Sequence, residues 1–178
     1  SNNFIAEQVL KTIGAEILGA PGTRRKGLAV VNRYMKRLGY GPESFVVDDG
    51  AGLSRKNRIT PAQLVRVLTD MYDDIRFRPE FVASLGVMGV DGSVKNRLDD
   101  TEAERRIRAK TGTLNGVDTL SGYAFSLDGD IIAFSILMNG SRCSHWRMRQ
   151  LQDRITLDLV RLDRRAIPRK RPSRRRTP

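Results

Sequence analysis

The apolar pattern in the second half of this 178-residue chain limits the possible folds more than any other feature. From Ile107 onward, the helical repeat gives way to alternation, which predicts three consecutive strands at residues 107–113, 119–127 and 130–138. The last two strands are joined by Asp128-Gly129, a dipeptide typical of a tight hairpin turn. We therefore expect an antiparallel sheet in this half of the chain.

The third of these strands predicts how the sheet is covered. Residues 131–138 are apolar on both faces, and only Ser135 interrupts them. A strand of this kind is buried on both sides, so helices should cover the front and the back of the sheet. The expected fold class is thus α+β, with an antiparallel sheet flanked by helices.

Apolar repeats and end signals predict these helices. A stripe from Ile5 to Ile17 indicates a first amphipathic helix that ends at Gly19, and Thr60-Pro61 supplies an N-cap and a first helical residue for another. We also expect helices at residues 23–38 and 79–85, a short strand at residues 45–47, and a closing helix with an inner stripe of Met148, Leu151, Ile155, Leu159 and Leu162.

Charge marks one boundary, near residue 163. The net charge is +12, and residues 164–178 hold eight Arg or Lys, three prolines and no acidic residue, so residues 1–163 carry 12 − 8 = +4. We expect residues 1–163 to form one domain and residues 164–178 a disordered basic tail. Such a tail suits contact with a polyanion (nucleic acid, anionic lipid or cell-wall polymer) and, equally, a solubilising end without a specific partner.

Composition argues against several classes of function. No apolar run reaches the roughly 18 residues of a membrane-spanning helix, so no transmembrane segment is expected. Cys143 and His145 are the only Cys and His. They cannot supply a disulfide or the four ligands of a structural zinc site, and we expect no metal or other cofactor. We interpret them as a semi-buried thiol beside a surface imidazole.

Lys110-Thr111-Gly112 is the sharpest local motif, and it lies on the first predicted strand. It places a charge and a hydroxyl beside a stretch of bare backbone, and the missing side chain at Gly112 lets another chain approach closely. This arrangement suits an extended peptide whose terminal carboxylate is held by Lys110 and Thr111. The alternative is an exposed lysine near a turn.

Ser1-Asn2-Asn3 precedes the first predicted helix. Ser and Asn are typical helix N-caps. Two residues apart on a helix, Ser1 and Asn3 would point nearly opposite ways, but in the non-helical turn before it both can face one cleft. Capping and a role in a cleft can coexist.

In this order, Ser-x-Asn and Lys-Thr-Gly resemble the second and third motifs of the penicillin-interacting serine enzymes, whose first motif is Ser-x-x-Lys. Longer stretches resemble the D-alanyl-D-alanine carboxypeptidase/endopeptidase family that includes the DacB-type penicillin-binding proteins. These stretches are SNNFIAEQVLKTIG from Ser1, DDGAGLSRKNRITPAQLVRVL from Asp48, GVDGSVKNR from Gly89 and AKTGTLNGVDTLSGYAFS from Ala109.

The resemblance implies a β-lactamase/transpeptidase-like fold, acyl-enzyme chemistry on peptidoglycan stem peptides, β-lactam binding, and a place in the periplasm or cell envelope. It implies that Ser1 shuttles a proton to the leaving group, and that Asn3 hydrogen-bonds the substrate peptide and helps hold the catalytic lysine. Lys110 would set a positive potential and, with Thr111, receive the carboxylate of D-alanine. The backbone N–H of Thr113 would be one oxyanion-hole donor. The expected site residues are Ser1, Asn3, Lys110, Thr111, Gly112 and Thr113.

One motif of that family is not found. No serine of the chain is followed three positions later by a lysine. We expect the nucleophile, its lysine and the N-terminal strands to lie upstream of Ser1, which would leave this chain incomplete and inactive by itself. Ser54 is expected to make a structural loop hydrogen bond. Asp91, Ser93 and Arg97 are expected to order the approach to the cleft rather than to act in the chemistry.

Two other functions stay open on the sequence alone. One is a polyanion-binding module that uses the basic tail, although the body has neither a basic helix with base-reading residues nor aromatic stacking motifs. The other is a class A β-lactamase, a class of enzyme with motifs of the same kind. The loops after Val47 and before Lys110 look more like the peptidase family.

Overall fold

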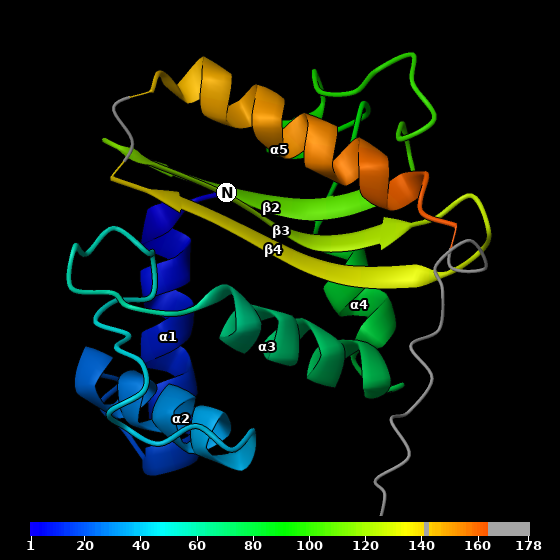
Figure 1. Ribbon diagram of the computed structural model, residues 1–178. Helices are drawn as coiled ribbons and strands as arrows, with labels where there is room; N and C mark the ends of the chain where they lie inside the picture. The colour runs from blue at the N-terminus through cyan, green and yellow to red at the C-terminus, as the bar shows by residue number, and fades with distance from the viewer. Residues whose placement is uncertain (141–142, 164–178) are drawn as a thin grey trace, which may run out of the picture.

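The computed structural model describes residues 1–140 and 143–163 (Figure 1). The expected domain of residues 1–163 therefore lies almost entirely within the described part. The predicted basic tail of residues 164–178, with its expected disorder and polyanion contact, lies outside it. In the described part of the chain, no helix is both long and apolar enough to cross a membrane.

An antiparallel sheet with the order β1-β2-β3-β4 forms the centre of the described structure. Its long strands are β2 (Ile107–Leu114), β3 (Val117–Phe125) and β4 (Ile131–Asn139), which confirm the three predicted strands. The sequence did not predict β1 (Gly86–Val87), a two-residue strand that pairs only with Arg108 and Ala109 of β2.

Helices cover both faces of the sheet, as the apolar pattern of β4 predicts. Helix α5 (His145–Val160) lies on one face, and α3 (Pro61–Asp73) and α4 (Arg78–Ala83) lie on the other (Figure 1). Between the sheet and α5 lies a core that includes Ile107, Leu120, Phe134 and Val160. On the other face, Leu68, Leu85 and Tyr123 form a second core, and the Tyr123 hydroxyl donates to the Leu68 carbonyl at 2.6 Å.

Helices α1 (Asn3–Leu18) and α2 (Arg24–Arg37) pack against each other beside the sheet (Figure 1). Their backbones approach so closely that a Cβ on Gly27 would lie 2.2 Å from the Leu10 carbonyl oxygen. The apolar stripe of α1 does not share in this contact. Its side chains are 39% to 59% exposed at the four positions Ile5, Val9, Ile13 and Ile17.

Two local predictions are wrong. Residues 45–47 form no strand, and only an isolated bridge joins Val46 to Arg58. On α5, Leu151 and Ile155 of the predicted inner stripe are 52% and 36% exposed. The helix buries Met148, as predicted, but the other residues that it buries are Gln152, Thr156 and Val160. This rotation is possible because the Thr156 hydroxyl donates to the Gln152 carbonyl (2.9 Å) and Arg97 donates to the Gln152 side chain (3.1 Å).

Candidate active site

The six predicted site residues line one cavity of about 320 Å³, called the groove below. They reach it from the start of α1 and from β2, and the loop after residue 48 adds Ala51, Gly52 and Leu53. The groove has two sides. The helix wall consists of residues 1–3 and 51–53, and the strand wall consists of residues 110–114 of β2.

The helix wall starts with a capped helix end. Asn2 is the N-cap of α1, and its side chain accepts a hydrogen bond from the Ile5 amide at 3.1 Å. Capping by the middle residue leaves the side chains of Ser1 and Asn3 without a capping role, and both residues line the groove. Asn3 is already the first residue of the helix, so only Ser1 and Asn2 lie in the preceding turn.

Two carboxylates hold the loop that completes the helix wall. Asp49 accepts backbone hydrogen bonds from Gly52 (3.0 Å), Leu53 (2.9 Å) and Ser54 (2.9 Å). Glu7 of α1 accepts from the amides of residues 50 and 51 at 2.6 and 3.2 Å. Burial favours the neutral form of Asp49. The hydrogen bonds from Asn57 and from the amides of residues 52–54 outweigh burial and lower the pKa of Asp49.

The strand wall presents its lysine over bare backbone. The Lys110 ammonium donates to the Thr111 carbonyl at 2.6 Å, and desolvation lowers the pKa of Lys110. A Cβ on Gly112 would lie 2.6 Å from the hydroxyl oxygen of Thr119 on β3. A side chain at residue 112 would therefore displace the Thr119 hydroxyl, in addition to hindering the approach of another chain that the sequence suggests.

The outer edge of the strand wall is open for pairing. β1 pairs with β2 only at Arg108 and Ala109, whereas the inner edge of β2 pairs with β3 along its whole length. Within the described residues, the backbone of residues 110–114 thus has no strand partner on the groove side. An extended peptide can add to such an edge through main-chain hydrogen bonds.

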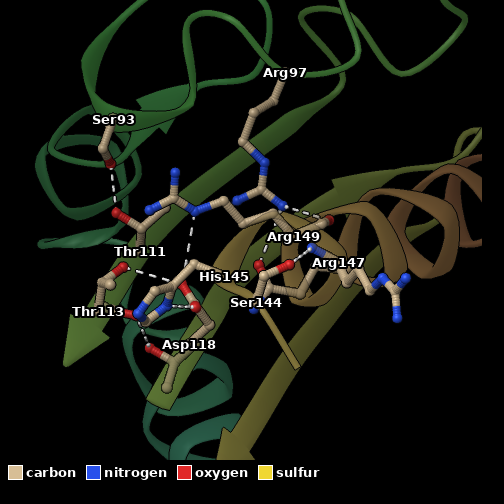
Figure 2. Close-up of polar contacts among 12 residues, drawn as sticks. Ser93, Arg97, Thr111, Thr113, Asp118, Ser144, His145, Arg147 and Arg149 are labelled. Carbon is tan, nitrogen blue, oxygen red and sulfur yellow. Dashed lines mark hydrogen bonds and ion pairs between the residues drawn. The ribbon is translucent and has the colours of Figure 1, made fainter. Parts of the chain in front are cut away.

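Hydroxyls on the strand wall are fixed from behind by neighbouring elements, as Figure 2 shows. The hydroxyls of Ser93 and Thr111 share a hydrogen bond at 2.6 Å. The Thr113 hydroxyl donates to Asp118 Oδ1 at 3.1 Å, and Asp118 is 2% exposed. At the start of α5, His145 Nδ1 contacts Asp118 Oδ2, and Arg149 Nε lies 3.6 Å from Asp118 Oδ1.

This Asp118 cluster is the part of the site that sequence reasoning missed. The predicted strand began at residue 119, whereas β3 begins at Val117, so the sequence pattern placed Asp118 outside the sheet. His145 is a surface imidazole, as predicted, with its side chain 42% exposed, but it also bonds to a buried carboxylate. Cys143 is exposed rather than semi-buried. Ser54 does make loop hydrogen bonds, one of them to Asp48 Oδ2 at 2.6 Å.

The other residues near the groove make structural contacts. Asp91 accepts from the Val87 amide at 2.6 Å, and Arg97 donates to Asp153 on α5 at 2.8 Å. Among the residues that the structure describes, no group of three or more His, Cys, Asp or Glu side chains is placed to hold a metal ion.

An antiparallel sheet with helices on both faces, and with Lys-Thr-Gly on a strand that faces Ser-x-Asn, defines the β-lactamase/transpeptidase-like class of fold. The family model of the D-Ala-D-Ala carboxypeptidase 3 (S13) family matches residues 1–160. The chain belongs to this family.

A curated relative agrees with this assignment, and a solved structure shares the fold. The D-alanyl-D-alanine carboxypeptidase of Actinomadura sp. (strain R39) is 41% identical over 145 residues, which are 79% of this chain and 26% of that protein. Penicillin binding protein 4 (dacB) of Haemophilus influenzae superposes with a TM-score of 0.80 at 24% identity, covering 90% of this chain and 37% of that one. That protein also has a crystal structure complexed with a β-lactam.

A more distant solved structure also shares the fold. It is a class A β-lactamase representative of Bacteroides cellulosilyticus, with a TM-score of 0.57 at 19% identity over 89% of this chain and 62% of that one. The chain spans about a quarter to a third of the length of the curated relatives it matches.

Proposed function

We propose that this chain supplies the substrate-binding half of a serine-type D-alanyl-D-alanine carboxypeptidase/endopeptidase that acts on peptidoglycan stem peptides. The single observation that carries the proposal is the groove, in which Ser1, Asn3 and Lys110-Thr111-Gly112 face one cavity from distant parts of the chain. Because the sequence holds no Ser-x-x-Lys motif, the nucleophile comes from residues outside these 178.

The proposed reaction has two acyl-transfer steps. The nucleophilic serine oxygen attacks the carbonyl carbon of the penultimate D-alanine, and the C–N bond to the next residue breaks. The amine leaves with a proton that Ser1 relays. Water then attacks the acyl-enzyme, gives the free carboxylate and returns the proton to the serine oxygen.

Each wall of the groove supports a different part of this reaction. The open edge of residues 110–114 pairs with the extended substrate, and the Lys110 ammonium and Thr111 hydroxyl receive its terminal carboxylate. The Thr113 amide stabilises charge on the carbonyl oxygen, and Asn3 holds the substrate amide from the helix wall. The Ser93 and Asp118 hydrogen bonds fix the Thr111 and Thr113 hydroxyls before substrate arrives.

The exposed stripe of α1 supports a partner within the same protein. Four large apolar side chains on one helix face form a surface that soluble domains rarely leave uncovered. We infer that the rest of the catalytic domain covers it and brings the nucleophile to the groove. By its family, the protein works in the periplasm or cell envelope.

Labelling with a fluorescent penicillin tests the proposal. In the full-length protein, Lys110→Ala should slow acylation by about 100-fold or more, because a charged group that binds the carboxylate is lost. Lys56→Ala is the matched control, since Lys56 lies in the exposed loop and does not line the groove. Equal labelling of the Lys110 variant and the wild type would show that Lys110 is misassigned.

The lifetime of the acyl-enzyme separates this function from that of a class A β-lactamase. The proposed peptidase should keep the penicilloyl group long enough for mass spectrometry to detect the adduct on the intact full-length protein. Rapid turnover of penicillin without an accumulated adduct would favour the β-lactamase instead.

A further inference from the structure

A buried carboxylate lies directly behind the strand wall. Asp118 of β3 is 2% exposed, and its register partner on β2 is Thr113. The Thr113 hydroxyl donates to Asp118 Oδ1 at 3.1 Å. A hydroxyl has one hydrogen to donate, so that of Thr113 is not available to a substrate. Of the side chains on the strand wall, Lys110 and Thr111 then remain to receive a terminal carboxylate.

The charge of Asp118 opposes the binding of such a carboxylate. Residues two apart on a strand share a face, so Thr111 and Thr113 point to the same side of β2. A substrate carboxylate held at Thr111 would therefore lie close to Asp118, and two negative charges repel each other at short range. A buried carboxylate without partners is also costly to the fold. Asp118 therefore needs groups that offset its charge from the side away from the groove.

The first turn of α5 supplies two such groups, which Figure 2 shows beside Asp118. His145 is the first residue of α5, and its Nδ1 contacts Asp118 Oδ2. An ionised carboxylate only accepts hydrogen bonds, so His145 Nδ1 is the donor. Arg149 Nε lies 3.6 Å from Asp118 Oδ1. The two residues are four positions apart, so their side chains lie on one face of the helix.

Other charged side chains of this region are engaged elsewhere. Arg97 and Asp153 form an ion pair with each other at 2.8 Å. Arg147 also belongs to the start of α5, but it is exposed and points away from Asp118 (Figure 2). Within the described part of the chain, the ionic partners of Asp118 are therefore His145 and Arg149.

We propose that His145 and Arg149 are positioning residues, which act through Asp118 on the recognition of the substrate carboxylate. This inference rests on the proposed function. The two residues hold Asp118 against the Thr113 hydroxyl and offset its charge, so the potential of the strand wall stays positive where the leaving residue binds. Neither of them lines the groove, and neither contacts the substrate.

A pair of peptides separates this electrostatic role from a merely structural one. In the full-length protein, His145→Ala and Arg149→Ala should each lower kcat/KM for a stem pentapeptide with a free terminal carboxylate by about fivefold. The loss should arise mainly through KM, because the charge of Asp118 is less well offset and repels the ligand. The same peptide with a C-terminal amide carries no charge at this position, so its kcat/KM should change by less than about twofold.

A matched control and conservative variants sharpen this test. Arg147→Ala removes the same charge from the same helix, at a side chain that points away from Asp118, and should stay within about twofold on both peptides. His145→Asn keeps an N–H donor at the position of Nδ1, and Arg149→Lys keeps the positive charge. Each should recover most of the activity on the carboxylate peptide.

A double variant tests whether the effect passes through Asp118. Asp118→Asn removes the charge that has to be offset, and its amide oxygen can still accept from Thr113. Added to His145→Ala, it should bring the ratio of kcat/KM for the two peptides back toward the wild-type value, because the effects of coupled residues do not add.

Three results would overturn the proposal: equal losses on the two peptides, an unchanged carboxylate peptide, or a double variant without any recovery. A wild type that cleaves neither peptide and is not acylated by penicillin would instead refute the proposed function.

Discussion

The two walls of the groove are positioned by different forces. The strand wall belongs to β2, where Ile107 and Ala109 are buried in the core and every residue pairs with β3. The helix wall depends on polar contacts, chiefly those of Glu7 and Asp49 with backbone amides. Moreover, α1 turns its apolar stripe away from the described residues.

This difference indicates which wall responds to conditions. Apolar burial and a continuous ladder of backbone hydrogen bonds change little with pH or salt. Hydrogen bonds to carboxylates weaken when the carboxylate is protonated. We therefore expect the strand wall to determine the stability of the fold and the helix wall to determine when the groove is properly formed.

The largest expected effect comes from crowding β2 just before the strand wall. In Gly122→Ala, the new Cβ would lie 2.0 Å from the Arg108 carbonyl oxygen, a backbone atom of β2 that cannot move alone. We expect the free energy of unfolding, measured with urea, to fall by about 3 kcal/mol or more. Gly41→Ala has open space around its new Cβ and should be close to neutral. Similar losses of unfolding free energy in both variants would contradict the expectation that β2 is too rigid to make room for a Cβ at residue 122.

A smaller, pH-dependent effect is expected on the helix wall. Asp49→Asn replaces Oδ2, which accepts from the Leu53 and Ser54 amides, and should cost about 1–2 kcal/mol at pH 7. The folded pKa of Asp49 is lowered, so its contribution is present above the ordinary pKa and is lost as pH falls through the folded pKa.

Urea unfolding of wild type and Asp49→Asn at pH 7 and near pH 3 checks this sign. The gap between the two proteins should shrink at the lower pH. Asp99→Asn, at an exposed position, serves as the control and should show a small gap at both. A gap that widens in acid would contradict the assigned role of the carboxylate.

Next in size is a change behind the strand wall that should not depend on pH. Tyr123→Phe removes the hydrogen bond to the Leu68 carbonyl and should cost about 1 kcal/mol. Burial raises the pKa of Tyr123 to about 12, so its hydroxyl stays protonated and donates at both pH 7 and pH 9. Thermal unfolding at these two values should show equal losses. A loss of stability at only one of the two pH values would contradict the prediction that this hydrogen bond does not depend on pH.

The smallest effect is expected at the surface of the helix wall. Arg24 pairs with Glu7 at 3.3 Å, and its side chain is 54% exposed. Arg24→Gln should change the free energy of unfolding by less than about 0.5 kcal/mol, and added salt should remove even that. A loss above about 1 kcal/mol in urea unfolding would mean that Glu7 needs Arg24 to hold the loop.

Much of the fold could be predicted because its signals are local. Alternation predicted β2, β3 and β4, and Thr60-Pro61 predicted the start of α3, which has a complete capping box. The face that α5 buries could not be predicted, because Gln152 and Thr156 are polar and are satisfied only by contacts made in the folded state.

In the candidate site, too, local motifs could be predicted and contacts between distant residues could not. The motif residues around Lys110 were visible as sequence patterns, and the structure places them with Ser1 and Asn3 in one groove. The link between Asp118 and His145 joins residues 27 positions apart, and no local pattern announces it. Their roles in the reaction stay predictions.

The cross-strand pair of Thr113 and Asp118 acts as a check on alignment. A slip by one position would set Asp118 opposite Gly112 or Leu114, neither of which carries a side-chain donor. The Asp118 carboxylate would then be buried without the hydrogen bond from the Thr113 hydroxyl. The hydroxyls of Thr111 and Thr113 would move to the opposite face of the sheet. The segment next to Lys110 thus penalises misregistered hairpins and selects the one alignment that forms the proposed substrate groove.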